Sequence, residues 1–295
     1  MNCHHQKYLS ASMLALTAFG ALLLSPSPGL AVPILGSDLA SFAVLGATGV
    51  TDVATSTIGG NLGSAPNGSI GGGYVFSSGS LQANTSIAQN AQLQLDAAIL
   101  AVNASGPGTT ITGGNLDAWE SSHGGVIIPG TYTVPAATTN LVGTLILDGQ
   151  NNNNAVWNFL FPSTLITSTT SNVTVQHVGN GEGVGLYWSV GSAATLNGNT
   201  FAGNVLAQTL ISSDGNLSMG CGRLLSATSQ VTLIHDSVST GCGGGTGSKK
   251  SGGFDQGNVG SGGTGGDAKV PEPATLLLLG SGMVGLAVWR MKKST

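Results

Sequence analysis

Charged side chains are scarce in this sequence. They make up 7% of its 295 residues, whereas soluble proteins usually carry about 25%. Between Gln6 and Gly247 the only basic side chains are Lys7 and Arg223. Proteins bind nucleic acid by displacing counterions from phosphate with lysine and arginine, so this composition argues against a nucleic-acid partner. The net charge of −4 is spread along the chain and forms no acidic block.

The sequence also lacks the usual motifs of catalysis and metal binding. It contains no nucleophile elbow, no zinc-protease motif and no phosphate-binding loop. His235 and Asp236 come closest to a catalytic pair, but neighbours in a strand point to opposite faces. If the chain winds into stacked coils, Asp214 and Asp236 could lie on adjacent coils and hold Ca²⁺. Two carboxylates without a supporting loop make a weak site, however. We therefore expect no enzymatic activity, no metal and no cofactor.

Cysteine is rare as well, with Cys3, Cys221 and Cys242 as its only occurrences. Because we expect residues 1–31 to be removed, the mature chain keeps two cysteines, which suits one disulfide in an exported protein. A Cys221–Cys242 bond would close a loop of about 20 residues and stabilise the fold by roughly 3 kcal/mol. Two free buried thiols are the alternative. A zinc site is not expected, since no Cys-x-x-Cys or histidine pair accompanies them.

The N-terminus has the pattern of a secretory signal peptide. A short polar region ends at Lys7, the apolar run "MLALTAFGALLLS" follows, and the small residues Gly29 and Ala31 come next. This order predicts cleavage after Ala31. A retained membrane anchor is the alternative, but the apolar run is short for a transmembrane helix.

The C-terminal region predicts a flexible linker and then a sorting signal. Residues 241–268 are rich in glycine and serine without apolar periodicity, as expected for a tether. Within 269–295, the motif Pro271-Glu272-Pro273 precedes the uncharged stretch 274–289. That stretch is marginally long enough to cross a bilayer. The basic residues after it are those that the positive-inside rule expects on the cytoplasmic side, namely Arg290, Lys292 and Lys293.

This C-terminal arrangement resembles the PEP-CTERM sorting signal of Gram-negative bacteria that produce exopolysaccharide. The resemblance rests on the motif, the short helix and the basic tail, which occur in that order at the end of the chain. It implies that an exosortase at the inner membrane cuts near the motif and passes the protein to the cell surface. An ordinary single-span tail is the alternative.

One segment of the region 32–240 predicts an amphipathic helix. Thr85 or Ser86 can cap its start, and Gly106-Pro107 lies beyond its end. We expect the helix to pack against an apolar surface through one stripe. The stripe comprises Ile87, Ala91, Leu95, Ile99 and Val102.

The rest of this region predicts short strands separated by glycine, asparagine and serine. Strands are expected at 144–149, 156–161, 172–178, 185–190, 209–213 and 230–234. Four-residue units recur, since Gly203-Asn204-Val205-Leu206 returns as Gly222-Arg223-Leu224-Leu225 after 19 residues. Thr209-Leu210-Ile211 is followed about 21 residues later by Gln230-Val231-Thr232. Looser copies of the first unit are Gly60-Asn61-Leu62 and Gly114-Asn115-Leu116.

A repeat of about 20 residues with short strands fits one coil of a β-solenoid. Each coil of such a fold buries its small apolar side chains only by stacking on its neighbours. Equivalent outward residues of successive coils would then lie about 4.8 Å apart. An antiparallel β-sandwich is the alternative, but it does not explain the repeated units.

Several segments together resemble the microbial β-solenoid ice-binding protein family. They include "ILGSDLASFAVLGATGVTD", "LVGTLILDGQNNNNAVWNFLFPSTLIT", "YWSVGSAATLNGNTFAGNVLA" and "CGRLLSATSQVTL", in the family's order from Leu35 to Val238. The resemblance implies an all-β fold, a right-handed, irregular, parallel β-solenoid of triangular section with one long α-helix alongside. It also implies adsorption to the surface of an ice crystal, for which a rigid, uncharged face of hydroxyls and amides is suited.

Some members of that family carry Thr-Ala/Gly-x-Thr/Asn motifs on the ice-binding face. Asn197-Gly198-Asn199-Thr200 occupies such a place, with asparagine instead of the first threonine. One coil later, Asp214-Gly215-Asn216-Leu217 keeps only the glycine. The candidate ice-binding residues are therefore Thr138, Thr139, Asn140, Ser168, Thr169, Thr170, Ser171, Asn197, Asn199, Thr200, Asp214 and Asn216.

A second hypothesis is a non-catalytic surface or matrix protein that binds exopolysaccharide. The sorting signal motivates it, because that export system accompanies exopolysaccharide production in general. Trp157 and Trp188 lie in apolar strands and are expected in the core, whereas Trp119 is the better candidate for an exposed ring.

Overall fold

The computed structural model describes residues 34–178 and 183–241. The predicted signal peptide, the predicted sorting signal and all of the predicted linker except Gly241 lie outside these residues. Among the described residues, no helix is long and apolar enough to cross a membrane.

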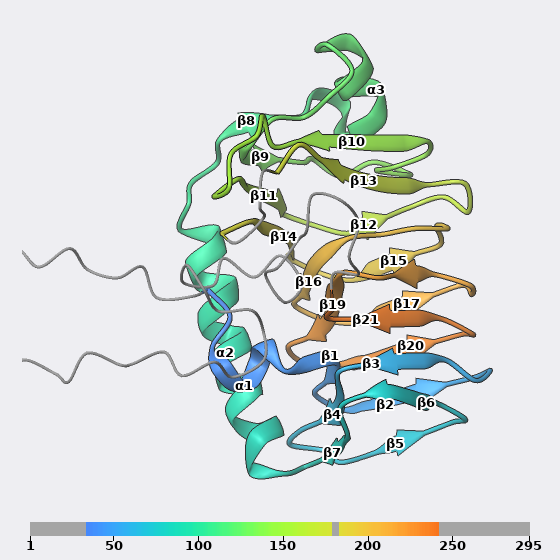
Figure 1. The fold of residues 1–295 in the computed structure, drawn as a ribbon. Helices are drawn as coiled ribbons and strands as arrows, with labels where there is room; N and C mark the ends of the chain where they lie inside the picture. Colours follow the sequence, from blue (N-terminus) through green and yellow to red (C-terminus); the bar gives the residue numbers. More distant parts are fainter. Residues whose placement is uncertain (1–33, 179–182, 242–295) are drawn as a thin grey trace, which may run out of the picture. The chain divides into compact units, whose positions relative to one another are not determined.

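The described chain winds into coils whose strands form three parallel sheets, which we call A, B and C (Figure 1). Sheet A has the spatial order β7 (Leu81–Ala83), β4 (Asn61–Ser64), β1 (Phe42–Gly46), β19 (Gly222–Ser226), β16 (Gly203–Ala207), β14 (Gly185–Val190), β11 (Val156–Phe161), β9 (Gly130–Thr133), β8 (Thr109–Thr110). Sheet B has the order β12 (Leu165–Ile166), β15 (Ala194–Leu196), β17 (Ile211–Ser213), β20 (Gln230–Leu233), β2 (Gly49–Asp52), β5 (Ile70–Gly71). Sheet C consists of a four-stranded group, β18 (Ser218–Met219), β21 (Ser237–Ser239), β3 (Thr57–Gly59), β6 (Val75–Ser78), and the pair β10 (Thr144–Asp148), β13 (Asn172–Gln176). The predicted parallel β-solenoid is confirmed.

The order of the coils in space differs from their order in the sequence. Strands β1 to β7 form the first coils, and the chain then crosses to the far end of the solenoid before it winds back. The last coil, β19 to β21, consequently pairs with the first, β1 to β3. This coil joins the N-terminal coils to the rest of the solenoid.

The predicted helix is α2 (Ser86–Asn103), which runs along sheet A and is capped by the Thr85 hydroxyl. The predicted stripe is partly wrong. Ile87 is 40% exposed, whereas Ala88 and Ala98 are fully buried. Alanine at these positions lets the helix backbone approach the sheet closely, where it meets α1 (Ser37–Ala40) and the outward apolar residues of sheet A.

Apolar side chains fill the inside of the coils, and the aromatic ones stack from coil to coil. The ring centroids of Tyr132 and Phe159 lie 5.5 Å apart, and those of Phe159 and Trp188 lie 4.4 Å apart. Trp157 and Trp188 are fully buried, as predicted. Cys221 is disulfide-bonded, and its predicted partner Cys242 lies outside the described residues.

The strand register confirms one of the predicted repeats and corrects another. Gly203 to Leu206 pair in register with Gly222 to Leu225. In the second repeat, however, Ile211 pairs with Val231 and not with Thr232. The predicted alignment was therefore one residue out, and a slip of one residue moves every side chain to the opposite face of a strand.

The third predicted copy, Gly114-Asn115-Leu116, forms no strand. It belongs instead to the 3₁₀ turn η1 (Thr112–Gly114) and the start of a short helix, α3 (Leu116–Ser122), which the sequence analysis did not predict. The Asn115 side chain accepts a hydrogen bond from the Ala118 amide and caps this helix.

Helix α3 closes one end of the solenoid. Asp117 accepts hydrogen bonds from the amides of Val142 and Gly143, both at 3.0 Å. Glu120 accepts one from the Ile146 amide, also at 3.0 Å. The carboxylates of the helix therefore satisfy backbone donors that a terminal strand would otherwise present to solvent.

Candidate functional site

Two of the three sheets present an open outer face, because α2 covers sheet A (Figure 1). The outer face of sheet B, called face B here, carries one outward residue from each strand at the same level. This row consists of Ile166, Thr195, Ser212, Thr232, Thr51 and Gly71, each in register with the next. Four consecutive coils thus place a hydroxyl at an equivalent position.

The hydroxyls of this row are free to contact water. Among the described residues, Thr51, Thr195, Ser212 and Thr232 have no side-chain hydrogen-bond partner. Strand pairing fixes their spacing at about 4.8 Å. Each hydroxyl residue stands between inward neighbours that are buried, so the backbone beneath the row is held by the core.

The outer face of sheet C, called face C, also carries a row of small polar residues, but a less regular one. Only isolated bridges through Thr200 join its two groups of strands, and the register shifts between Ile58 and Gly59. The Thr200 hydroxyl is already engaged, since it donates to Asn172 Oδ1 at 3.0 Å. The row comprises Thr144, Asn172, Thr200, Ser218, Ser237, Thr57 and Val75.

Face C also bears a titratable pair at the ends of β10 and β13. His177 Nδ1 lies 2.8 Å from Asp148 Oδ2. The hydrogen bond from His177 lowers the pKa of the Asp148 carboxyl, and further hydrogen bonds from Gln150 and Gln176 act in the same direction. Face B has no counterpart of this pair in its hydroxyl row.

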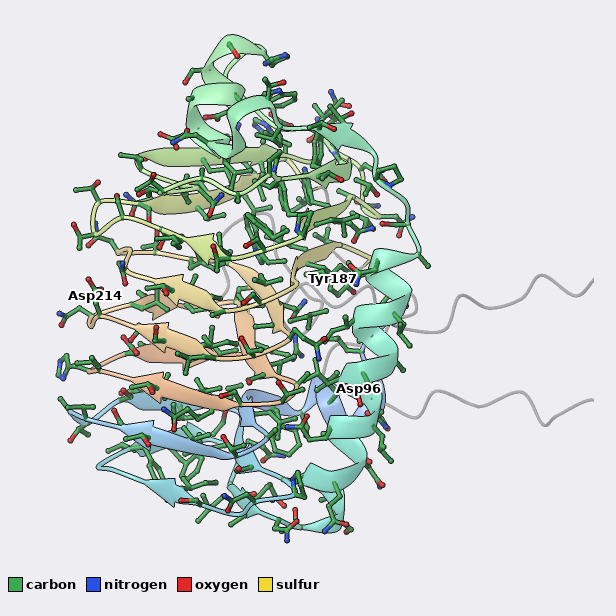
Figure 2. The ribbon with its side chains drawn as sticks, turned by 180° about the vertical axis from the view of Figure 1, so that it is seen from behind. Asp96, Tyr187 and Asp214 are labelled. Atoms are coloured by element: carbon green, nitrogen blue, oxygen red, sulfur yellow. The ribbon has the colours of Figure 1, made fainter. Side chains whose placement is uncertain are left out.

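Most of the residues predicted to bind ice lie in the turns between sheets B and C. Seven of them are exposed: Thr138, Thr169, Thr170, Asn199, Thr200, Asp214 and Asn216. Three are half-buried: Thr139, Ser168 and Asn197. Asp214 extends into solvent from its turn, as Figure 2 shows.

Two of the predicted residues, Asn140 and Ser171, are fully buried and cannot contact a surface. Asn140 Oδ1 accepts the Ile166 amide at 2.9 Å, and its Nδ2 donates to the Gly114 carbonyl at 2.9 Å. The side chain therefore links adjacent coils through hydrogen bonds to their backbones. Ser171 packs beneath Gly198, where a Cβ would meet its hydroxyl. The prediction was wrong for both because a small polar side chain at a corner can point inward: Asn140 bonds to backbone of adjacent coils, and Ser171 is enclosed by packing alone.

The hydroxyl row of face B was not among the predicted site residues. Its members stand in "VTD", "ATL", "ISS" and "VTL", where a small polar residue separates two inward-facing residues. Alternation of this kind was the available signal. The predicted alignment of the second repeat was one residue out and matched Thr232 with the inward-facing Ile211. That misalignment concealed the row of outward hydroxyls.

Asp214 and Asp236, the two carboxylates considered for a Ca²⁺ site, differ in their surroundings. Asp236 is buried and accepts hydrogen bonds from the Ser213 hydroxyl and from the amides of Leu217 and Ile234. Burial raises the pKa of Asp236, although these hydrogen bonds act against that rise. Asp214 is exposed and points outward, whereas Asp236 is buried. No group of three or more metal-binding side chains occurs among the described residues.

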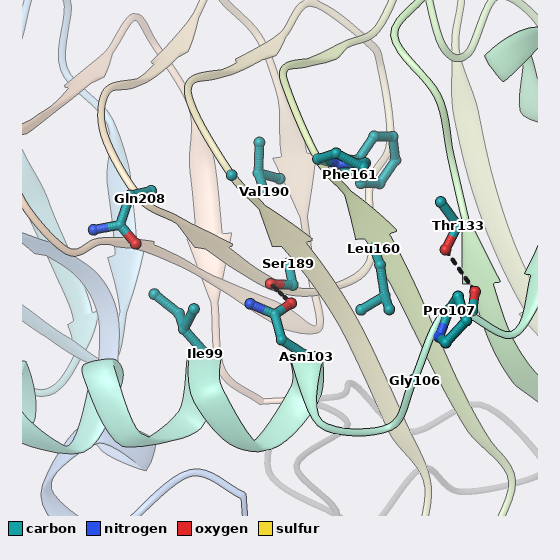
Figure 3. A pocket seen from close by; sticks show the side chains of 12 residues that line it. Ile99, Asn103, Gly106, Pro107, Thr133, Leu160, Phe161, Ser189, Val190 and Gln208 are labelled. Atoms are coloured by element: carbon teal, nitrogen blue, oxygen red, sulfur yellow. Dashed lines mark hydrogen bonds between the residues drawn. The ribbon is translucent and has the colours of Figure 1, made fainter.

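A cavity of about 370 Å³ lies between the end of α2 and the turns from sheet A to sheet B (Figure 3). Its wall combines apolar side chains with neutral amides and hydroxyls, and none of its residues titrates. Ser189 donates to Asn103 Oδ1 across it at 2.8 Å. Such a wall offers no general acid or base.

No lysine or arginine is exposed on the described part of the chain. Arg223 is its only basic residue of these types, and it is fully buried. Its guanidinium donates to the Ala40 carbonyl and, at 2.8 Å, to Asn204 Oδ1. The described surface therefore has almost no positive charge with which to attract phosphate.

Trp119, the tryptophan expected to have an exposed ring, is half-buried and stacks on His123 with 4.0 Å between ring centroids.

The sequence matches two protein-family models. The Ice-binding-like model matches residues 44–239, which hold all three sheets almost completely. The chain belongs to the ice-binding-like family. A second model, the PEP-CTERM protein-sorting motif, matches residues 269–293, which indicates export and sorting to the membrane or surface.

Individual relatives agree with this assignment. An "Ice-binding protein" of Nostoc sp. (strain HG1) is 30% identical over 286 residues, covering 96% of this chain and 94% of its own. An "Ice-binding protein" of Flavobacterium frigoris (strain PS1) is 26% identical, covering 68% of this chain and 73% of its own. The crystal structure of an ice-binding protein from Antarctomyces psychrotrophicus matches with a TM-score of 0.59 and 28% identity, covering 70% of this chain and 97% of its own.

Proposed function

We propose that this ice-binding-like protein adsorbs to ice through face B. The observation that carries the proposal is the row of four free hydroxyls, from Thr51, Thr195, Ser212 and Thr232, on four hydrogen-bonded coils. The names of the relatives from Nostoc and Flavobacterium frigoris support ice as the ligand.

Face B suits ice for physical reasons. A rigid row of hydroxyls with a fixed repeat can order a layer of water that continues into an ice plane. Mobile charged side chains would favour bulk hydration instead, and the row contains none. Because recognition uses surface shape and hydroxyls, it needs no cofactor and no catalytic group. We accordingly propose that the protein is not an enzyme.

Face B is a better candidate than face C for three reasons. Its six strands pair without interruption, its hydroxyls are unengaged, and no ion pair lies beside its row. Apart from Thr200, which belongs to the row of face C, the exposed members of the predicted set border face B along the turns toward sheet C. In this proposal Asn199 and Asn216 extend the contact, while Asp214 weakens it because its carboxylate retains bulk hydration.

The proposal includes display at the cell surface of a Gram-negative bacterium. Removal of residues 1–31 and transient anchoring by the segment 274–289 would deliver the domain to an exosortase, as the match to the sorting motif supports. The last described residue, Gly241, follows Thr240, whose amide donates to the Gly59 carbonyl at 2.9 Å. Gly59 lies where sheet C turns to sheet A, so the tether starts at the corner opposite face B. Attachment at that corner leaves face B clear of the start of the tether.

The test is steric. Thr195→Tyr and Thr232→Tyr place bulky side chains on face B, and Ser218→Tyr and Ser237→Tyr place the same group on face C. We expect inhibition of ice recrystallisation by the purified protein to fall about tenfold in the face B variants, equivalent to ~1.4 kcal/mol. The face C variants should retain it.

The outcomes separate the parts of the proposal. Loss of inhibition in the face C variants alone would show that the wrong face was assigned. Absence of inhibition and of thermal hysteresis in the folded wild-type protein would overturn ice binding altogether.

A further inference from the structure

Among residues 34–178 and 183–241, no element covers the end of the solenoid formed by β5, β6 and β7. Each of these strands is the last in its sheet, so one backbone edge has no strand partner among the described residues. We call this the open end. An unpaired strand edge is a template for pairing with another chain.

The core itself reaches solvent at the open end. Ile70, Phe76 and Leu81 occupy the inward positions that Val50, Ile58 and Leu62 occupy one coil earlier. The earlier residues are no more than 2% exposed, whereas Leu81 is 43% exposed and Ile70 and Phe76 are half-buried. Val75 adds an outward apolar side chain that is 55% exposed. Solenoids normally need a polar cap at such a position for solubility.

Charge is absent from the open end. Residues 53–95 contain no Asp, Glu, Lys, Arg or His. Natural proteins commonly guard an exposed strand edge with lysine or proline, but neither residue occurs in β5, β6 or β7. Contact at the open end would therefore bury apolar and neutral polar groups without burying a charge.

We propose that the open end binds the open end of a second copy of this chain. A two-fold pair brings the same surface of both copies together, so like charges near the axis would repel each other, and a surface without charge avoids that repulsion. Edge strands related by a two-fold axis perpendicular to them run antiparallel, so their free amide and carbonyl groups can bond to each other. The inward residues of the two terminal coils would then cover one another.

The chain ends favour one orientation of this pair. A two-fold axis normal to face B places both Gly241 residues on the side opposite face B, because each tether starts at the corner between sheets A and C. Both chain ends therefore leave the pair on the same side. The two B faces then lie side by side, which doubles the hydroxyl row; this consequence rests on the proposed ice binding, whereas the pairing does not.

The test compares charge insertion at two apolar surfaces of the full chain in mild detergent. Val75→Lys, alone and with Leu81→Lys, puts charge on the open end. The matched control is Leu93→Lys with Leu100→Lys, on the outer side of α2, where both leucines are about 70% exposed. Analytical ultracentrifugation gives the mass, and circular dichroism verifies folding.

We expect the wild type and the α2 control to sediment as dimers and both open-end variants as monomers. A monomeric wild type over the accessible concentrations overturns the proposal, as does a control that dissociates like the open-end variants. Ice activity provides a separate readout. Monomeric Val75→Lys should keep part of its recrystallisation inhibition, whereas loss of ice activity in Thr232→Tyr should leave the dimer intact.

Discussion

At the α3 end of the solenoid, carboxylates accept hydrogen bonds from a terminal strand and a helix covers the core, whereas at the opposite end three strands expose their edges. Leu116 of α3 is fully buried, while Leu81 of β7 is 43% exposed. The same stacking of coils runs between the two ends. The two ends therefore differ in how their last coils are covered, and among the described residues a capping helix occurs only at the α3 end.

The largest expected effect comes from truncating the apolar residue at each end. Leu116→Ala leaves a cavity under α3 and should lower the free energy of unfolding by about 2–5 kcal/mol. Leu81→Ala removes a side chain that already contacts water and should cost about 1 kcal/mol or less in the monomer. Urea unfolding of the purified variants measures both values. Equal losses would mean that the open end is covered in solution.

A smaller effect is expected from the hydrogen bonds of the cap. Asp117→Ala removes the acceptor for the amides of Val142 and Gly143 and should cost about 1–2 kcal/mol, since water can replace part of each bond. Asp96→Ala is the control, because Asp96 is exposed on α2 and has no hydrogen-bond partner among the described residues (Figure 2). The control should change stability by less than about 0.5 kcal/mol. An equal change in the stability of both variants would show that the Asp117 hydrogen bonds do not stabilise the closed end.

The smallest effect is a dependence on pH at the closed end. Burial raises the pKa of Glu120 above its usual value of 4.5, and the nearby Asp117 adds to the rise, against the hydrogen bond from Ile146. Because the unfolded chain ionises first, the free energy of unfolding should fall as pH rises from the unfolded pKa toward the folded pKa. Glu120→Gln should reduce this fall.

The fall should not vanish in Glu120→Gln, because the raised pKa of Asp236 acts in the same direction. Urea titrations between acidic and neutral pH measure the slope for each protein. An unchanged slope in Glu120→Gln would show that Glu120 is solvated.

Local sequence patterns were sufficient to predict strands and their pairing where one segment repeats the pattern of its neighbour. The strand expected at 156–161 is β11, and the units at Gly203 and Gly222 pair in register. The helix was equally visible from its cap at Thr85. Stacked coils reuse one pattern of inward and outward residues, so a repeat in the sequence becomes a neighbour in space.

Local patterns could not predict whether a polar residue at a corner of the solenoid is buried or exposed. Asn140 and Thr138 are both polar residues near one turn, yet Asn140 is buried as a rung between coils and Thr138 is exposed. The difference depends on whether a backbone amide of the adjacent coil lies within reach. That partner is distant in sequence, since Asn140 bonds to Ile166 and Gly114.

The sequence by itself determined that the chain is almost uncharged, and its repeats and one amphipathic stripe favoured a β-solenoid with one long helix. The sorting signal followed from a resemblance of the C-terminal motif, apolar segment and basic tail to a known signal. The tertiary structure decided which hydroxyls share a face, because the coil that holds Thr232 pairs with the coil that holds Thr51, 181 residues earlier in the chain. It also decided that one end is closed and the other open. Both outcomes depend on the return of the chain to its first coil, which brings together strands that no local pattern connects.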